Sequence, residues 1–152
     1  MIEAQIATTI QKATRDHVTY IANLALQLWE DHTQIELADE FCQLIDRNDV
    51  AIFLAFTDDN AIGFAQCQLR YDYVEGTGSS PVAYLEGIFV ENPFRKQGLA
   101  RKLIAACEQW AKDKGCQEFA SDCELNNTDS LSFHLHSGFE EANRIICFVK
   151  KI

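Results

Sequence analysis

Hydrophobic and polar residues recur along the chain with two periods, which predict a mixed succession of strands and helices. Strand-like alternation or short apolar runs occupy residues 5–13, 51–57, 61–73, 83–90, 118–123 and 144–151. Helical spacing follows a capping residue at Thr14 or Asp16 and continues to Trp29, and it returns at 35–46, 99–115 and 127–138. The predicted order is β-α-α-β-β-β-α-β-α-β, which indicates an α/β fold in a single domain spanning residues 1–152.

The clearest part of this pattern is a helix between two apolar segments. Its apolar stripe consists of Leu99, Leu103, Ile104, Cys107 and Trp110. Gly115 is expected to end the helix. Because a strand is predicted before it at 83–90 and another after it at 118–123, we expect a β-α-β unit with parallel strands.

The amino-acid composition indicates the class of protein. The chain is 47% hydrophobic and 24% charged, as in ordinary soluble domains. No apolar run reaches the roughly 18–20 residues that a membrane span needs, and the N-terminus, MIEAQIATTIQK, lacks the basic-then-apolar pattern of an export signal. We therefore expect a cytoplasmic protein.

The cysteines fit the same expectation. They stand singly inside apolar segments, without a CxxC pair, so we interpret them as small core residues in a reducing compartment. The six are Cys42, Cys67, Cys107, Cys116, Cys123 and Cys147. A zinc site is the alternative for Cys116, Cys123, His134 and His136, but their spacing matches no familiar ligand pattern.

Charge narrows the choice of partner. The formal net charge is −10, from 13 Lys+Arg and 23 Asp+Glu. A negative surface repels nucleic acid and anionic membranes, which we therefore exclude as partners, whereas cationic small molecules and basic proteins remain open. The simpler alternative is that the acidity only promotes solubility.

One stretch runs against this acidity. FRKQGLARKL, residues 94–103, places Arg95, Lys96, Arg101 and Lys102 around Gly98 at the start of the predicted helix. A helix N-terminus presents unpaired backbone N–H groups, and glycine allows a ligand to approach the backbone, so the stretch can bind an anion. The alternative is a tight turn with solvated charges. Neither a GK[ST] nor a GxGxxG motif is present.

Two motifs give the chain a recognisable family. Arg95-Lys96-Gln97-Gly98-Leu99-Ala100 resembles the Arg/Gln-x-x-Gly-x-Gly/Ala loop of the GCN5-related N-acetyltransferase (GNAT) superfamily. The later run from Asn127 to Phe139, with Ser130, His134 and Gly138 at the same spacing, is similar to that family's second motif.

The resemblance implies the GNAT fold, a mixed and mostly antiparallel sheet with a central parallel β-α-β unit that binds acetyl-CoA. It implies no metal. The backbone of the strand at 83–90 would hold the pantetheine of acetyl-CoA through Ile88, Phe89 and Val90. The diphosphate would lie on Arg95, Lys96, Gln97, Gly98, Leu99, Ala100 and Arg101, and Asn127 would contact the pantetheine arm.

A narrower resemblance concerns the acceptor. Trp29 with His32, the run RYDYVEGTGSSPVAYLEGIFV at 70–90 and GCQEFASD at 115–122 look like the aminoglycoside 6′-N-acetyltransferases of bacterial resistance. This implies transfer of an acetyl group from acetyl-CoA to the 6′-amine of a polycationic aminoglycoside. Trp29, His32 and Tyr73 would contact the substrate. Because C-terminal strands commonly pair across dimers in related enzymes, the resemblance also implies a homodimer.

Glu86 is the most informative single residue. It interrupts the apolar run Tyr84-Leu85-Glu86-Gly87-Ile88-Phe89, where a lone buried carboxylate is costly. Strand alternation puts Glu86 on the same face as Tyr84 and Ile88. One interpretation is a structural salt bridge, and the resemblance adds another, in which Glu86 binds the aminoglycoside and helps to deprotonate its amine, directly or through water.

Asp122 follows the neighbouring strand, where ligand clefts form in α/β folds, although it could also cap the next helix. Glu86 and Asp122 are thus the candidate catalytic acids. Carboxylates attract an ammonium group but also raise its pKa, so one carboxylate or a water must accept the proton as attack proceeds.

Two departures from the family pattern remain. His134 stands where many members have a tyrosine that protonates the leaving thiolate, and Asn143 stands where an acidic substrate contact is expected. Direct transfer in a ternary complex is favoured over a covalent route through Cys123, because nothing nearby would activate that thiol. Other open functions are a polyamine or peptide-amine acetyltransferase and a non-catalytic module that senses acyl-CoA.

Overall fold

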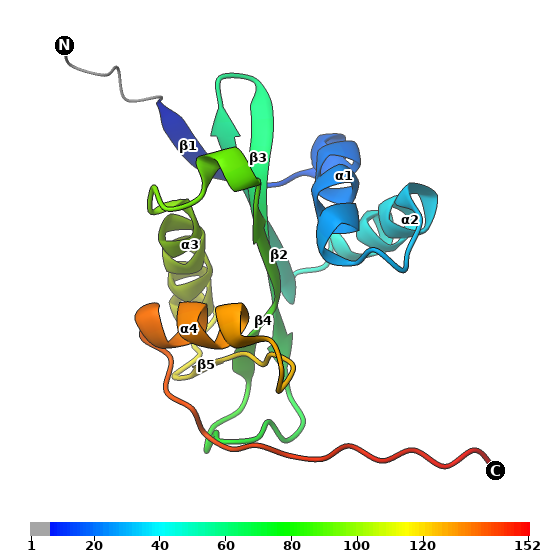
Figure 1. Cartoon of the computed structure of the whole chain (residues 1–152), viewed down its shortest axis with the longest axis vertical. Helices are drawn as coiled ribbons and strands as arrows, with labels where there is room; N and C mark the ends of the chain where they lie inside the picture. The colour runs from blue at the N-terminus through cyan, green and yellow to red at the C-terminus, as the bar shows by residue number, and fades with distance from the viewer. Residues whose placement is uncertain (1–6) are drawn as a thin grey trace.

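The computed structural model describes residues 7–152, and its elements follow the predicted order up to the last helix (Figure 1). Positions 5 and 6 of the predicted first strand lie outside the described residues. The elements are β1 (Thr8–Lys12), a 3₁₀ turn η1 (Arg15–His17), α1 (Val18–Leu28), α2 (Gln34–Leu44), β2 (Val50–Thr57), β3 (Asn60–Arg70), β4 (Val82–Val90), a 3₁₀ turn η2 (Asn92–Phe94), α3 (Leu99–Asp113), β5 (Phe119–Ala120) and α4 (Thr128–His136).

The strands form one mixed sheet in the order β1-β2-β3-β4-β5. The first four are antiparallel neighbours, and β5 pairs parallel to β4, so the predicted parallel unit of β4, α3 and β5 is confirmed. This unit lies at the edge of the sheet formed by residues 7–152. Helices α1 and α2 lie on one face of the sheet, and α3 and α4 lie on the other (Figure 1).

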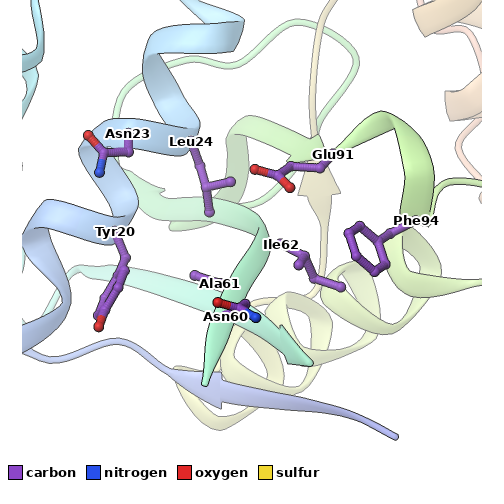
Figure 2. A pocket seen from close by; sticks show the side chains of 8 residues that line it. All are labelled: Tyr20, Asn23, Leu24, Asn60, Ala61, Ile62, Glu91 and Phe94. Carbon is purple, nitrogen blue, oxygen red and sulfur yellow. The ribbon is translucent and has the colours of Figure 1, made fainter. Parts of the chain in front are cut away.

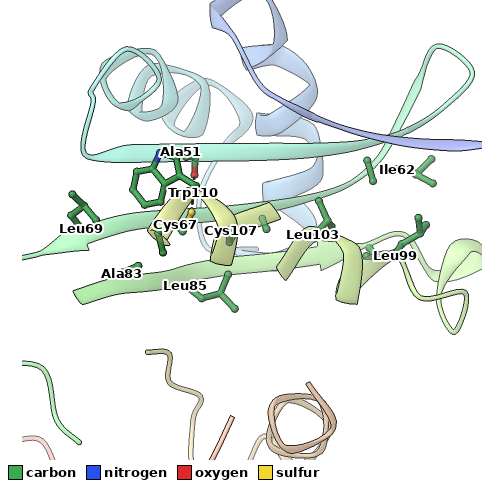
Figure 3. Close-up of a cluster of buried hydrophobic side chains, with 14 residues drawn as sticks. Ala51, Ile62, Cys67, Leu69, Ala83, Leu85, Leu99, Leu103, Cys107 and Trp110 are labelled. Carbon is green, nitrogen blue, oxygen red and sulfur yellow. Dashed lines mark hydrogen bonds between the residues drawn. The ribbon is translucent and has the colours of Figure 1, made fainter. Parts of the chain in front are cut away.

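Each face of the sheet is buried against its own helices. The predicted stripe of α3 packs on Ala51, Ile62, Cys67 and Leu85, and its own members Leu103 and Cys107 are fully buried (Figure 3). On the opposite face, Ile21 and Ala25 of α1 and Phe41 of α2 pack against Leu54 and Phe64. Each apolar stripe therefore faces the sheet, as expected for amphipathic helices.

A β-bulge in β4 changes which side chains share a face. Gln66 of β3 lies opposite Gly87, whereas the next residue, Cys67, lies opposite Leu85, so Glu86 is the additional residue. Before the bulge Leu85 faces α3, and after it Ile88 packs on the same cluster. The expectation that Ile88 shares a face with Glu86 is therefore wrong, because alternation resets at the bulge.

The predicted last strand, 144–151, does not form. The segment has no regular structure, and its side chains at Ile146, Phe148 and Val149 are 81–92% exposed. A strand needs a neighbour to satisfy its backbone groups, and β5 offers only two residues at the sheet edge. Two other predicted strands are shorter than expected, since β3 ends at Arg70 and β5 at Ala120.

The cysteine interpretation holds for part of the set. All six are free thiols, and Cys67 and Cys107 are buried in the cluster under α3, as expected for core residues. Cys42 and Cys147 are exposed instead, because Cys42 lies away from the stripe of α2 that meets the sheet and Cys147 belongs to the strand that does not form. None of the helices within 7–152 is long and apolar enough to cross a membrane.

Candidate active site

The two predicted catalytic acids belong to one connected polar group. Arg70, the last residue of β3, donates to both carboxylate oxygens of Glu86, with N···O distances of 3.0 and 2.9 Å. The same guanidinium lies 3.4 Å from the centroid of the Tyr84 ring. The Tyr84 hydroxyl donates to Asp122. Glu86 and Asp122 are thus joined through Arg70 and Tyr84, on the face of β4 opposite α3.

Electrostatics in this group keep Tyr84 protonated. Burial of the ring and the hydrogen bond to the Asp122 carboxylate raise the pKa of the Tyr84 hydroxyl, because both disfavour a phenolate. Tyr84 therefore acts as a hydrogen-bond donor that orients Asp122. One cation and two carboxylates leave the group with a negative formal charge, which suits an ammonium ligand.

Trp29 supports the backbone beside Glu86. A Cβ atom on Gly87 would lie 2.7 and 2.8 Å from Cζ2 and Cη2 of the Trp29 ring, so only glycine fits there. The ring also meets Phe64 edge-on, with 6.0 Å between centroids. Trp29 follows the last residue of α1, and its contact with Gly87 brings this helix end to the bulge that carries Glu86.

The other predicted substrate contacts are more exposed. His32 lies one turn beyond Trp29, and its Nδ1 is 3.5 Å from Glu36. Tyr73 is 79% exposed and donates to Glu75 at 2.7 Å. Asn143 donates a hydrogen bond to the same carboxylate at 2.8 Å. This bond connects the loop after β3 to the C-terminal segment.

The predicted pantetheine residues lie where β4 loses its neighbour. Strands β4 and β5 pair only at Ala83 with Phe119 and Tyr84 with Ala120. Beyond this point β4 continues to Val90, and Glu86 through Phe89 are half-buried. Alternate backbone groups of Ile88, Phe89 and Val90 therefore face the side that β5 has left, where they can bond a ligand, except for the carbonyl oxygen of Val90, which accepts a hydrogen bond from Arg95.

The predicted diphosphate turn follows directly. Arg95 donates through Nε to the carbonyl oxygen of Val90 at 2.7 Å, which fixes the turn to the end of β4. Lys96 and Gly98 have φ values of 63° and 81°, and Gly98 is the residue before α3. Within 7–152, the amides from Lys96 to Arg101 donate no hydrogen bond to another part of the chain, so they present N–H groups at the positive end of a 15-residue helix.

Asn127 and His134 belong to α4. The side chain of Asn127 accepts from the amide of Ser130 at 3.1 Å, so it caps this helix and keeps its NH₂ group free for a ligand. His134 is the third residue from the C-terminal end of α4, and its Nε2 is 2.7 Å from the hydroxyl oxygen of Ser121.

Arg70 and Ser121 are the residues that sequence reasoning missed. A signal for Arg70 existed, because a carboxylate in an apolar strand needs a cation and Arg70 ends the strand paired with β4. Nothing in the pattern pointed to Ser121, since its partner His134 is distant in sequence and meets it only in the fold.

Two further observations concern metal binding and the position of a cavity. No group of three or more His, Cys, Asp or Glu side chains in the described part of the chain is arranged to hold a metal ion. A cavity of about 390 Å³ lies between α1, the start of β3 and η2 (Figure 2). It is lined by Tyr20, Asn23, Leu24, Asn60, Ala61, Ile62, Glu91 and Phe94, none of which is a predicted site residue.

Comparison with known proteins gives the site a context. The model of the acetyltransferase (GNAT) family matches residues 17–139. The aminoglycoside N(6′)-acetyltransferase type 1 of Salmonella typhimurium is 42% identical over 142 residues, which cover 93% of this chain and 98% of the relative. The protein of the same name from Acinetobacter baumannii is 44% identical over 126 residues, which cover 82% of this chain and 86% of the relative.

A solved structure agrees over nearly the whole chain. The structure of AAC(6′)-Iy in complex with the bisubstrate analogue CoA-S-monomethyl-acetylneamine has a TM-score of 0.92 and 40% identity, and the match covers 96% of this chain and 99% of that one. With the family model, the relatives and the parallel β4-α3-β5 unit in agreement, the chain belongs to the GNAT family of acetyltransferases.

Proposed function

We propose that this protein transfers the acetyl group of acetyl-CoA to the 6′-amine of aminoglycoside antibiotics, by direct attack in a ternary complex, and so confers resistance. The observation that carries the proposal is the junction of two unlike sites on β4. Its free edge and the following turn suit an anionic coenzyme, and its bulge carries the acidic group of Glu86, Arg70, Tyr84 and Asp122.

The donor half of the proposal rests on the turn after β4. The amides of Lys96 to Arg101, with Arg95 and Lys96 beside them, would hold the diphosphate. The backbone of Ile88, Phe89 and Val90 and the free NH₂ of Asn127 would hold the pantetheine, which places the thioester next to the bulge. A backbone N–H there would stabilise the oxyanion that forms during attack.

The acceptor half rests on the acidic group. Glu86 and Asp122 would bind ammonium groups of the drug, with Trp29, His32 and Tyr73 around them. Arg70 donates one hydrogen bond to each oxygen of Glu86, so the amine proton would pass to a remaining lone pair of the carboxylate, directly or through a water. The aminoglycoside 6′ specificity comes from the relatives, whose names specify that position.

The assay that tests the proposal compares acceptors. Thiol release from acetyl-CoA should depend on a kanamycin-type drug with a 6′-NH₂ group and should be lost with its 6′-OH analogue. Equal rates with both would exclude the 6′ assignment, and a preference for spermidine would favour a polyamine acetyltransferase. Absence of thiol release with every amine would favour an acyl-CoA sensor.

Glu86 provides the sharpest single-residue test. Glu86→Gln keeps the size of the side chain but removes its charge, so we expect kcat/KM for tobramycin to fall at least 100-fold. Glu40→Gln, which removes an exposed carboxylate on α2, should leave the rate within a factor of two. Full activity of Glu86→Gln with an unchanged KM would remove Glu86 from the mechanism.

The proposal also includes the setting of the enzyme. We place it in the cytoplasm as a single-domain homodimer that uses no metal and binds neither nucleic acid nor membrane. The net charge of −10 supports the choice of a cationic partner. The exposed apolar side chains of the C-terminal segment support a second copy as their cover.

A further inference from the structure

A serine-histidine pair stands beside the site and is not used by the steps above. The hydroxyl oxygen of Ser121 lies 2.7 Å from Nε2 of His134, and Nδ1 of the same ring lies 2.7 Å from the backbone oxygen of Ser130. A carbonyl oxygen only accepts hydrogen bonds, so Nδ1 carries a hydrogen. The hydrogen bond between Ser121 and Nε2 therefore depends on the charge of the ring.

The two charge states give Ser121 opposite roles. When the ring is neutral, Nε2 is bare and takes the hydroxyl hydrogen of Ser121, whose oxygen can then only accept from a ligand. When the ring is protonated, Nε2–H donates to the oxygen of Ser121, and the hydroxyl hydrogen turns to another acceptor, either the carbonyl oxygen of Leu85 at 3.5 Å or a ligand. The pair is thus built to pass a proton outward through Ser121.

Ser121 occupies the point where β4 and β5 separate. It directly follows the last residue of β5, and its hydroxyl is 3.5 Å from the carbonyl oxygen of Leu85, the first residue of β4 beyond the paired region. At this point the unpaired edge of β4 begins, and the same edge carries the backbone groups of Ile88, Phe89 and Val90 that are proposed to bind pantetheine. A pantetheine running along that edge from the turn after β4 would bring its thioester toward this point.

The neighbouring residue Asp122 points the other way. Asp122 meets Tyr84 on the face opposite α3, whereas Ser121 meets α4, which lies on the same side of the sheet as α3 (Figure 1). Consecutive residues of an extended chain alternate in this manner. The acids proposed for the incoming amine and the pair proposed here are therefore on opposite sides of the sheet.

The surroundings of His134 hold the ring without pairing its charge. Phe133 and Phe139 lie edge-on to it, with centroid distances of 5.6 and 5.2 Å. Its polar neighbours from α4 and from the segment after β5 are Ser130 and Ser121, and within 7–152 no acidic or basic side chain forms an ion pair with it. The ring is only half-buried, so it can regain a proton from water after each turnover.

We propose that Ser121 gives the proton to the departing coenzyme A thiolate and that His134 positions Ser121 and replaces that proton. This inference rests on the proposed function, because it requires acetyl-CoA along β4. The amine nitrogen bonds to the acetyl carbon as the carbon–sulfur bond breaks. The sulfur takes the hydroxyl hydrogen of Ser121, and the Nε2 hydrogen of the protonated His134 ring moves to the serine oxygen, which leaves the ring neutral. The proton lost by the amine passes on the opposite face to Glu86 or to a water.

The same helix supplies a matched control. His136 has Nδ1 2.7 Å from the backbone oxygen of Ser132, as His134 has with Ser130, but its side chain is exposed and makes no hydrogen bond to Ser121. His136→Gln therefore removes an equivalent helix contact without touching the pair. It should keep kcat within a factor of two.

The test measures kcat and KM for acetyl-CoA and tobramycin by thiol release, together with the Kd of coenzyme A. We expect Ser121→Ala and His134→Gln each to lower kcat at least tenfold, with the KM for acetyl-CoA and the Kd of coenzyme A within twofold of the wild type. Ser121→Thr, which keeps the hydroxyl, should retain at least a third of kcat. The double variant should be no slower than the slower single variant, because both changes break one relay.

Several outcomes overturn the proposal while leaving the proposed function intact. These are an unchanged kcat in Ser121→Ala, a loss in Ser121→Thr equal to that in Ser121→Ala, or a loss in His136→Gln equal to that in His134→Gln. If a variant does not fold, ¹⁵N NMR of the wild type decides, since the neutral ring must carry its hydrogen on Nδ1. A wild type without thiol release toward any amine contradicts both proposals at once.

Discussion

Arg70 forms a two-pronged salt bridge with Glu86, the residue proposed to bind the substrate. Its two hydrogen bonds to the carboxylate, at 3.0 and 2.9 Å, use the oxygens that an ammonium group of the drug would need. The side chain of Glu86 is only 19% exposed, so leaving it unpaired would be costly. Arg70 thus stabilises Glu86 and, under the proposed function, would compete with the substrate for it.

Replacing Arg70 should separate these two effects. In Arg70→Gln, we expect the free energy of unfolding to fall by about 1 kcal/mol, because Glu86 loses its cation. The KM for tobramycin should fall at least threefold, since the carboxylate is then free for an ammonium group. Chemical denaturation and steady-state kinetics measure the two quantities.

Arg47 offers a control for this prediction. It makes the same kind of two-pronged pair, with Asp49 at 2.9 and 2.7 Å, outside the site group. Arg47→Gln should leave the KM unchanged. A KM for Arg70→Gln that equals or exceeds that of the wild type would show that Arg70 assists the substrate and does not compete with it.

At this scale the sequence indicated the charges but not their partners. Glu86 was found because a lone carboxylate in an apolar strand is costly, which is a local property. Its contact with Arg70 depends on the strand register, and the side on which Ile88 lies depends on a bulge that alternation does not reveal. Ser121 and His134 likewise meet only after β5 and α4 pack together.

A glycine with a left-handed backbone lies near each end of helix α3, Gly98 directly before Leu99 and Gly115 two residues after Asp113. Gly98 has φ +81° and Gly115 has φ +83°, and a Cβ atom at either position would meet no other atom within 4 Å. An alanine at either end therefore costs only the strain of the left-handed backbone, about 1–2 kcal/mol. The two ends differ in what we propose for them, because only Gly98 lies in the coenzyme turn.

This pair of glycines tests the turn without confounding it with stability. Gly98→Ala and Gly115→Ala should lower the free energy of unfolding by similar amounts. Only Gly98→Ala should weaken coenzyme A binding, by at least tenfold, because its methyl group stands where the diphosphate approaches the backbone. Calorimetric Kd values and denaturation curves for both variants check this, and equal Kd values would place the diphosphate elsewhere.

Among the elements, the helices and the parallel unit were predictable and the last strand was not. The stripe from Leu99 to Trp110 specifies both a helix and its buried face, so α3 followed from spacing alone. The apolar run at 144–151 has equally strong strand composition. It remains irregular because composition does not supply a neighbouring strand, and β5 ends at Ala120.

The molecule as a whole separates two kinds of charge. The basic turn at the start of α3 and the acidic group around Glu86 both adjoin β4, so under the proposed function one strand would serve an anionic coenzyme and a cationic acceptor. The rest of the net charge of −10 adds a long-range attraction for a polycation.

We expect kcat/KM for the drug to fall as the salt concentration is raised, more steeply than kcat/KM for acetyl-CoA, because salt screens this attraction.

The exposed apolar side chains of the C-terminal segment predict that two copies of the protein associate through it. Phe148 and Val149 are 90% and 92% exposed, and burying one such side chain stabilises by about 1.5–3 kcal/mol. In a symmetric pair each contact occurs twice, so light scattering should give twice the chain mass of 17.2 kDa. Phe148→Glu with Val149→Glu should yield monomers, whereas Ile35→Glu, on an exposed position of α2, should not. A monomeric wild type, or a dimer that survives both glutamates, would mean that this segment does not form the interface.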